Sequence, residues 1–169
     1  HSSTQNVSIA AHDPNSNAIK KIRALLSDVK ISHNGNIVFN QTTSKDKKLL
    51  ARHKSKPLEK IVITMLKDSD NLIAESLFKK AGQITFNQPG SWANGHDAIS
   101  YALAKQNLPF SESQLQDGSG LSRYNLMSAK QIISLLKHIN NSTKHKKTII
   151  SGLPLAGIDG TLMWINSPA

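Results

Sequence analysis

The sequence predicts a mainly α-helical domain of the α+β class, with few and short strands. Apolar residues recur at helical spacing in several separate segments, and residues typical of helix ends flank those segments. Two short apolar runs, 37–39 and 49–51, have the extended character of strands. Helices therefore form most of the predicted core, which consists mainly of Leu, Ile, Val and Ala because aromatic residues make up 5% of the chain.

The predicted elements follow in order along the chain. Ser16 or Asn17 caps a first helix that ends near Val29, because small polar side chains accept hydrogen bonds from the first amides of a helix. Pro57 opens a second helix, since proline is tolerated in a first helical turn. Ala81-Gly82 closes the third helix. The remaining predicted segments are a turn at 33–36, a loop at 83–95, a helix at 97–106, an irregular stretch at 109–116, a helix capped by Ser128, a helix at 143–150 and a glycine-rich turn region at 151–161.

A length of 169 residues is typical of one domain. We expect residues 1–15, which are polar, to form an extended N-terminal segment, and residues 16–169 to form a single domain. The chain begins at His1 without methionine, so we expect a processed or trimmed piece of a longer protein. No apolar run approaches the ~20 residues of a membrane span, so no stable membrane span is predicted.

The charge and the titratable residues limit the classes of partner and cofactor. A net charge of +10 favours anionic partners. The lysine clusters at 45–48 and 144–147 lack aromatic residues, which argues against nucleic acid. Cysteine is absent and the seven histidines lack metal-motif spacing, so we predict no disulfide, no metal site and no cofactor.

The most informative stretch is the polar joint Ser69-Asp70-Asn71, which lies between two apolar-striped helices. One interpretation is that these three residues only cap the second of the two helices. The other is that Ser69 and Asn71 face a cleft, where a hydroxyl can pass a proton and an amide can hold a substrate amide. The tripeptide alone does not separate the two interpretations.

The loop from Asp117 to Arg123 is rich in glycine and also has more than one interpretation. It is a turn that needs glycine backbone angles, or a phosphate cradle, although it lacks the Lys-Ser/Thr ending of a P-loop. Arg123 is by default a surface arginine, but on such a loop its guanidinium can also bind a carboxylate through two hydrogen bonds. Trp92 either covers the core, which we favour, or lies at the rim of a cleft.

A serine nucleophile with a lysine one turn later has the pattern S-x-x-K. The pattern occurs four times in this lysine-rich chain, which shows how little specificity it has alone. Three of the serines lie inside predicted helices and one lies in a charged loop, so we assign none as nucleophile. The four pairs are Ser27/Lys30, Ser44/Lys47, Ser76/Lys79 and Ser134/Lys137.

Four blocks in this order carry a family resemblance. They are Pro57-Leu58-Glu59, the stretch from Met65 to Glu75, the loop from Asp117 to Leu126, and the stretch from Leu153 to Leu162. Together they resemble the class C penicillin-binding proteins, which are serine D-alanyl-D-alanine carboxypeptidases and endopeptidases, over about residues 17–163. The resemblance implies the helical portion of a domain like those of penicillin-binding proteins and serine β-lactamases.

By this resemblance, Ser69 and Asn71 are catalytic residues of the S-x-N motif, Ser69 in the proton relay and Asn71 holding the backbone of the substrate. Arg123 is then a substrate-binding residue that binds a carboxylate of the peptidoglycan stem peptide. The implied location is periplasmic or otherwise extracytoplasmic, and the implied ligands of the parent protein are stem peptides and β-lactam antibiotics.

The chain departs from the family pattern at two motifs. No S-x-x-K with the expected context precedes Ser69, and no K-T-G follows the block that begins at Leu153. We therefore expect a fragment that is inactive alone, because the nucleophile is needed for the covalent step. The alternative function is a non-catalytic basic module that binds an anionic cell-wall polymer.

Overall fold

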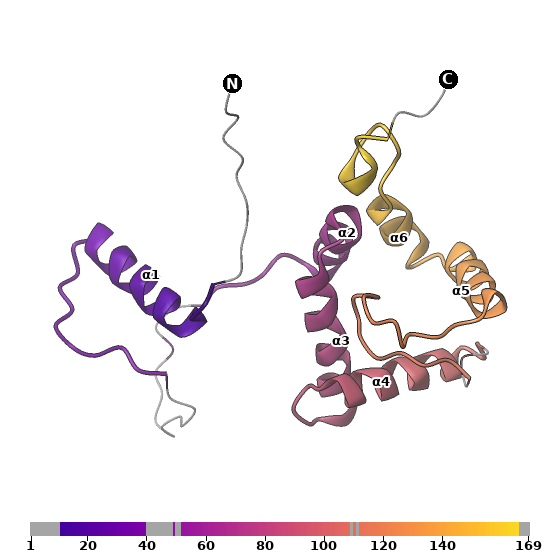
Figure 1. Ribbon diagram of the computed structural model, residues 1–169, viewed down its shortest axis with the longest axis horizontal. Helices are drawn as coiled ribbons and strands as arrows, with labels where there is room; N and C mark the ends of the chain where they lie inside the picture. The colour runs from indigo at the N-terminus through magenta and orange to yellow at the C-terminus, as the bar shows by residue number, and fades with distance from the viewer. Residues whose placement is uncertain (1–10, 40–48, 50–51, 109, 111, 166–169) are drawn as a thin grey trace. The chain divides into compact units, whose positions relative to one another are not determined.

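The computed structural model describes residues 11–39, 49, 52–108, 110 and 112–165. The chain divides into two compact units, residues 1–52 and residues 53–169 (Figure 1). The expectation that residues 16–169 form a single domain stays a prediction. Residues 1–10 of the expected extended segment lie outside the described residues.

The first unit contains helix α1, Pro14–Asp28. Asp13 caps it, since its Oδ1 accepts hydrogen bonds from the backbone N–H groups of Asn15 at 3.0 Å and Ser16 at 3.1 Å. The predicted cap at Ser16 or Asn17 is therefore wrong: Asp13 followed by Pro14 is the stronger start, because Pro suits the first helical position.

The strand predictions are also corrected. Residues 37–39 are described and form no strand, and Leu49 has no regular structure, while residues 50 and 51 lie outside the described part. A strand is stable only when its backbone pairs with a neighbour. No such partner is present among the described residues of this unit.

The second unit is helical, and this confirms the predicted fold class. Its one β-bridge among the described residues is antiparallel and joins Gln114 to Leu126. In the part of the chain that the structure describes, we find no helix with the length and apolarity to cross a bilayer. The helices are α2 Leu58–Asp68, α3 Asn71–Phe86, α4 Trp92–Lys105, α5 Ala129–Asn141, α6 Lys146–Gly152 and the 3-10 helix η1 Gly160–Leu162.

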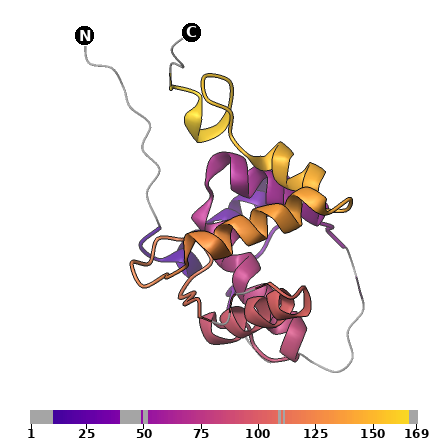
Figure 2. The same ribbon diagram turned by 90° about the vertical axis from the view of Figure 1, so that its right-hand side faces the viewer.

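The helices of this unit pack in two pairs. Helix α4 crosses the far end of α3, and α6 lies alongside α2 in both views (Figures 1 and 2). Phe78 of α3 and Ala98 of α4 are buried between the first pair, and Phe110 is also buried. Helices α2 and α3 follow each other almost directly, so the joint between them is close to both pairs.

Gly82 does not end α3, contrary to the prediction. A Cβ at Gly82 would lie 2.6 Å from the backbone carbonyl carbon of Asn94, so glycine permits the close approach of α4. Helix α3 continues to Phe86 and ends at Asn87, whose φ of 53° is left-handed. The glycine that resembles a helix end is therefore needed where α4 crosses α3.

The starts of α4, α5 and α6 test three further predictions. Ser128 caps α5, as predicted, in a reciprocal capping box with Gln131. Helix α4 begins at Trp92 rather than at Asp97, because Ser91 supplies its cap. Helix α6 begins three residues later than the predicted segment at 143–150.

Candidate functional site

The joint between α2 and α3 consists of Ser69 and Asp70. Ser69 adopts left-handed backbone angles, φ 52° and ψ 46°, and ends α2. Asp70 then donates its backbone N–H to the carbonyl of Met65 at 3.0 Å, which closes the last turn of α2. A non-glycine residue in the left-handed region is strained, and such strain is frequent at functional sites.

Asp70 alone performs the capping at this joint. Its Oδ1 accepts from the backbone N–H of Ile73 at 2.9 Å. Ser69 and Asn71 are exposed, and among the described residues neither of their side chains forms a hydrogen bond. The capping interpretation therefore applies to the middle residue, and the two flanking side chains are available for another task.

Asn71 lies on an open groove with a volume of about 550 Å³. Ser69 is not among the described residues that line this groove, and Arg123 is exposed directly after Ser122, which does line it. Asn71 is therefore the one predicted site residue that lines the groove. Ser69 and Arg123 lie close in sequence to lining residues, Ser69 two residues before Asn71 and Arg123 directly after Ser122. Helix α3, the start of α4 and the glycine-rich loop supply the lining: Asn71, Leu72, Glu75, Trp92, Gln116, Asp117, Ser119, Leu121 and Ser122.

The glycine-rich loop is held by its own first carboxylate. Asp117 Oδ1 accepts from the backbone N–H of Gly120 at 2.8 Å and from Nδ2 of Asn125 at 2.8 Å. Asp117 Oδ2 accepts from the backbone N–H of Ser122 at 2.7 Å. Burial alone would raise the pKa of Asp117, but hydrogen bonds from Asn125, Gly120 and Ser122 hold this pKa below its ordinary value.

This arrangement decides between the interpretations of the loop. The amides of Gly120 and Ser122, which a phosphate cradle would use, already donate to Asp117. The loop is therefore a turn that its own aspartate stabilises, and it has little capacity left for an anion at these amides.

Glu75 connects three elements beneath the groove. Its Oε1 accepts from the backbone N–H of Ser119 at 3.1 Å, and its Oε2 accepts from the indole Nε1–H of Trp92 at 2.8 Å. Burial alone would raise the pKa of Glu75, but hydrogen bonds from Ser119, Trp92 and Gly118 lower it below its ordinary value. Glu75 therefore accepts these bonds as a carboxylate.

Sequence reasoning did not find Glu75, and it misplaced Trp92. Glu75 lies four residues after Asn71, hence on the same face of α3, and this spacing was the available indication. Trp92 is 53% exposed at the groove, so the favoured interpretation that it covers the core is wrong.

The loop also lies directly against α3. A Cβ at Gly118 would be 2.5 Å from Cβ of Phe78 and 2.7 Å from the carbonyl oxygen of Ala74. Only glycine permits this approach, which sets the height of the loop above the helix. The close contact of Gly118 with α3 and the hydrogen bonds of Glu75 therefore both hold the loop beside the groove.

The fourth sequence block contacts the end of α2. Lys67 Nζ lies 2.5 Å from Oδ2 of Asp159 and donates to the carbonyl of Leu153 at 2.8 Å. Lys67 lowers the pKa of Asp159 below its ordinary value, with a further contribution from the backbone N–H of Leu155. The second and fourth blocks therefore meet two residues before Ser69.

The S-x-x-K serines that the structure describes lie in helices, as predicted for Ser27, Ser76 and Ser134. Ser76 donates its hydroxyl to the carbonyl of Leu72 at 2.7 Å within α3. Ser44 lies outside the described residues. Among those described, no group of three His, Cys, Asp or Glu side chains is placed to hold a metal ion.

Known proteins are similar to this chain in sequence and in fold. A family model described as D-Ala-D-Ala carboxypeptidase 3 (S13) matches residues 1–165. The D-alanyl-D-alanine carboxypeptidase DacB of Haemophilus influenzae is 36% identical over 156 residues, which are 92% of this chain and 32% of the relative. A D-alanyl-D-alanine carboxypeptidase of an Actinomadura species is 36% identical over 122 residues, 69% of this chain and 22% of the relative.

The solved structures agree with the sequences. The crystal structure of penicillin binding protein 4 (dacB) from Haemophilus influenzae, complexed with a β-lactam, has a TM-score of 0.80 at 36% identity, and covers 92% of this chain and 36% of that one. A second structure of the same protein has a TM-score of 0.78. The chain spans about a third or less of the length of these relatives.

Proposed function

Because the chain belongs to the D-Ala-D-Ala carboxypeptidase 3 (S13) family, we propose that it is the helical part of a serine D-alanyl-D-alanine carboxypeptidase or endopeptidase that acts on peptidoglycan. The observation that carries the proposal is the joint at the end of α2. Asp70 alone caps α3, Asn71 lines the groove, and Ser69 is exposed beside it. The middle residue of the tripeptide thus does the capping, and this leaves the Asn71 amide at the groove and the Ser69 hydroxyl exposed for the roles that we propose.

The side chains have separate tasks in the proposed reaction. The Asn71 amide holds the backbone amide or carbonyl of the substrate, since a carboxamide can donate and accept at once. The Ser69 hydroxyl passes a proton to the leaving group. Arg123, which is exposed after the groove loop, binds a carboxylate of the stem peptide through its planar guanidinium.

The nucleophile lies in another part of the parent protein. The 169 residues hold no S-x-x-K in a suitable context and no K-T-G. Without a nucleophile no acyl-enzyme forms, so the chain by itself is inactive and does not react with penicillin. The parent binds β-lactams, as the relative with a β-lactam in its structure does, and acts in the periplasm or another extracytoplasmic compartment, where peptidoglycan lies.

Fluorescent penicillin tests this proposal. We expect the parent protein to be labelled covalently, the isolated chain to remain unlabelled, and the parent with Asn71→Ala to label far more slowly while keeping its helical circular dichroism. Arg123→Ala should raise KM for a stem peptide more than it changes kcat, with Arg123→Lys intermediate because lysine has no planar fork. Stable labelling of the isolated chain contradicts the proposal.

The charge distribution favours a second candidate, a non-catalytic module that binds an anionic wall polymer. Residues 118–158 contain no Asp or Glu. Binding of this kind would appear as salt-sensitive sedimentation with purified peptidoglycan, unchanged by Asn71→Ala. The cationic residues in this stretch are Arg123, Lys130, Lys137, Lys144, Lys146 and Lys147.

A further inference from the structure

Trp92 has an unusual position for a large aromatic residue. It is the first residue of α4 and is 53% exposed. It lines the groove beside Asn71, and it also lines a neighbouring hollow of about 390 Å³ that includes His96, Asp97 and Gln114. Trp92 is therefore a shared wall of two hollows, one of which contains the proposed catalytic amide.

The indole ring is fixed although it is exposed. Its Nε1–H donates to Glu75 Oε2 at 2.8 Å, and Nζ of Lys79 lies 3.4 Å from the ring centroid. Glu75 and Lys79 are four residues apart on α3, so one face of one helix holds both the edge and a face of the ring. A ring that is ordered before a ligand arrives loses little entropy on binding.

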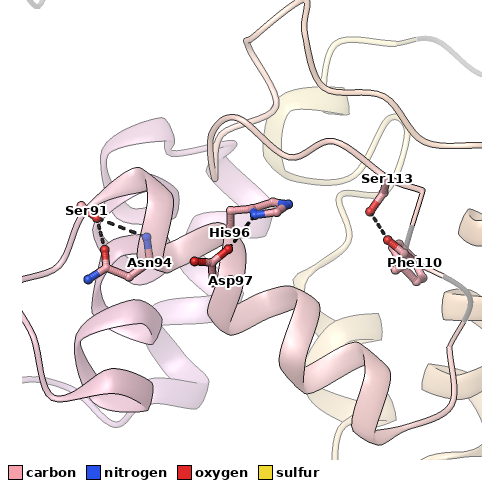
Figure 3. A network of polar contacts seen from close by, with 6 residues as sticks. All are labelled: Ser91, Asn94, His96, Asp97, Phe110 and Ser113. Atoms are coloured by element: carbon pink, nitrogen blue, oxygen red, sulfur yellow. Dashed lines mark hydrogen bonds and ion pairs between the residues drawn. The ribbon is translucent and has the colours of Figure 1, made fainter.

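The backbone that carries Trp92 is fixed as well. Ser91 accepts from the backbone N–H of Asn94 at 3.2 Å, and Nδ2 of Asn94 donates to the carbonyl of Pro89 at 2.9 Å. Figure 3 shows Ser91 and Asn94 at this start of α4, with His96 and Asp97 further along the same helix. His96 Nδ1 and Asp97 Oδ1 are 3.1 Å apart.

We propose that Trp92 is a substrate-binding residue, held in place by Glu75 and Lys79, and that the substrate peptide packs against its indole. The inference rests on the proposed function, because Asn71 on the same groove holds the peptide backbone. A peptide that ends in D-alanine offers small methyl groups to the ring and amides to Asn71.

Nuclear magnetic resonance of the full chain tests this inference directly. The chain contains two tryptophans, so Trp164→Phe assigns the indole N–H resonance of Trp92. The probe is a synthetic diacetylated tripeptide that ends in D-alanyl-D-alanine. We expect the indole N–H of Trp92 and the side-chain amide of Asn71 to shift together, while the indole of Trp164 does not respond.

Variants separate contact from support. Trp92→Ala should weaken binding about tenfold, the loss typical of an aromatic anchor, and Trp92→Phe should weaken it less because it keeps an apolar ring. Glu75→Gln should already shift the Trp92 indole resonance without peptide, since the carboxylate acceptor is gone. Glu59→Gln, a change in the first turn of α2 and outside the groove lining, is the matched control.

Three results overturn the inference. If the Asn71 amide shifts and the Trp92 indole does not, the peptide binds elsewhere on the groove and the proposed function remains. If Trp92→Ala binds the peptide as tightly as the unaltered chain, Trp92 is no anchor. If neither resonance responds, Trp92 is not a binding residue of this chain, and penicillin labelling of the parent decides the proposed function separately.

Discussion

The ammonium group of Lys67 lies 2.5 Å from Oδ2 of Asp159 and also donates to the carbonyl of Leu153 at 2.8 Å. These bonds join the last turn of α2 to the loop before η1, residues 92 positions apart in the sequence. The contact is made two residues before Ser69, so it fixes the end of α2 from the side. The geometry of the joint thus depends on a segment near the end of the chain.

This pair predicts a dependence of stability on pH. Lys67 lowers the pKa of Asp159, so its stabilisation is full above the ordinary aspartate value, about 3.9, and is lost as the pH falls through the lower folded-state value. Asp159→Asn should lower the Tm at neutral pH and should flatten its fall in acid. Both side chains are partly exposed, so we expect a small change.

Thermal melting followed by circular dichroism between about pH 3 and about pH 7 measures this effect. Asp68→Asn is the matched control, because its carboxylate lies on the same helix end and makes no ion pair among the described residues. Equal acid slopes for the unaltered chain and Asp159→Asn would show that the pair does not contribute.

Asp70→Ala tests the division of labour at the joint. Loss of the bond from Asp70 Oδ1 to the Ile73 N–H should lower the free energy of unfolding by about 1 kcal/mol, the usual contribution of a helix cap. Asp70→Asn should keep most of the stability, because asparagine is an equally good cap. Urea denaturation measures the free energy of unfolding of both variants. Asp68→Ala is the control, and its free energy of unfolding should stay within about 0.5 kcal/mol of that of the unaltered chain.

Local patterns were sufficient for much of this structure. The joint at 69–71, the glycine-rich turn and the Ser128 cap are each set by neighbours in sequence, and all three are confirmed in the structure. The family resemblance read from the four blocks is confirmed by the family match. Hydrogen bonds between near neighbours and the order of the four blocks can both be inferred from a single sequence.

Contacts between distant segments were not predictable in the same way. Gly82 has the composition of a helix end, but it is a crossing point, and only the position of α4 reveals this. The sequence favours a core position for Trp92, but the composition of a loop with Pro and Gly does not indicate which of its side chains are exposed. Glu75 was missed because its partners, Ser119 and Trp92, are 44 and 17 residues away.

Glu75 predicts a second effect of pH, this time on the groove. The pKa of Glu75 lies below the ordinary glutamate value, about 4.3. Its bonds to Ser119 and Trp92 as a carboxylate are therefore fully present above the ordinary value, and they are lost as the pH falls through the lower folded-state value. In a Trp164→Phe chain, the emission of Trp92 should shift to the red in acid as the indole becomes more hydrated. Glu75→Gln should show part of this shift at neutral pH.

The carboxylate of Asp117 is the second group that titrates beneath the loop, and the ammonium of Lys79 faces the Trp92 ring. Asp117→Asn is therefore the comparison variant: it should alter the loop but leave the acid response of Trp92 largely unchanged. If the acid response of Trp92 persists in Glu75→Gln and disappears in Asp117→Asn, the responsible carboxylate is that of Asp117, and the prediction for Glu75 is contradicted.

Ser69→Gly separates stability from function at the joint. Ser69 has a φ of 52°, a left-handed value that disfavours a side chain, so glycine should raise the free energy of unfolding by about 0.5–1 kcal/mol. The same change removes the hydroxyl of the proposed proton relay, so acylation of the parent protein by fluorescent penicillin should slow by about 100-fold.

Two variants serve as controls. Ser69→Ala should slow acylation equally without added stability. Asn87→Gly, at a φ of 53° and outside the groove lining, should not slow acylation. Stopped-flow labelling beside urea denaturation measures both quantities, and unchanged acylation of Ser69→Gly would exclude the hydroxyl from the reaction.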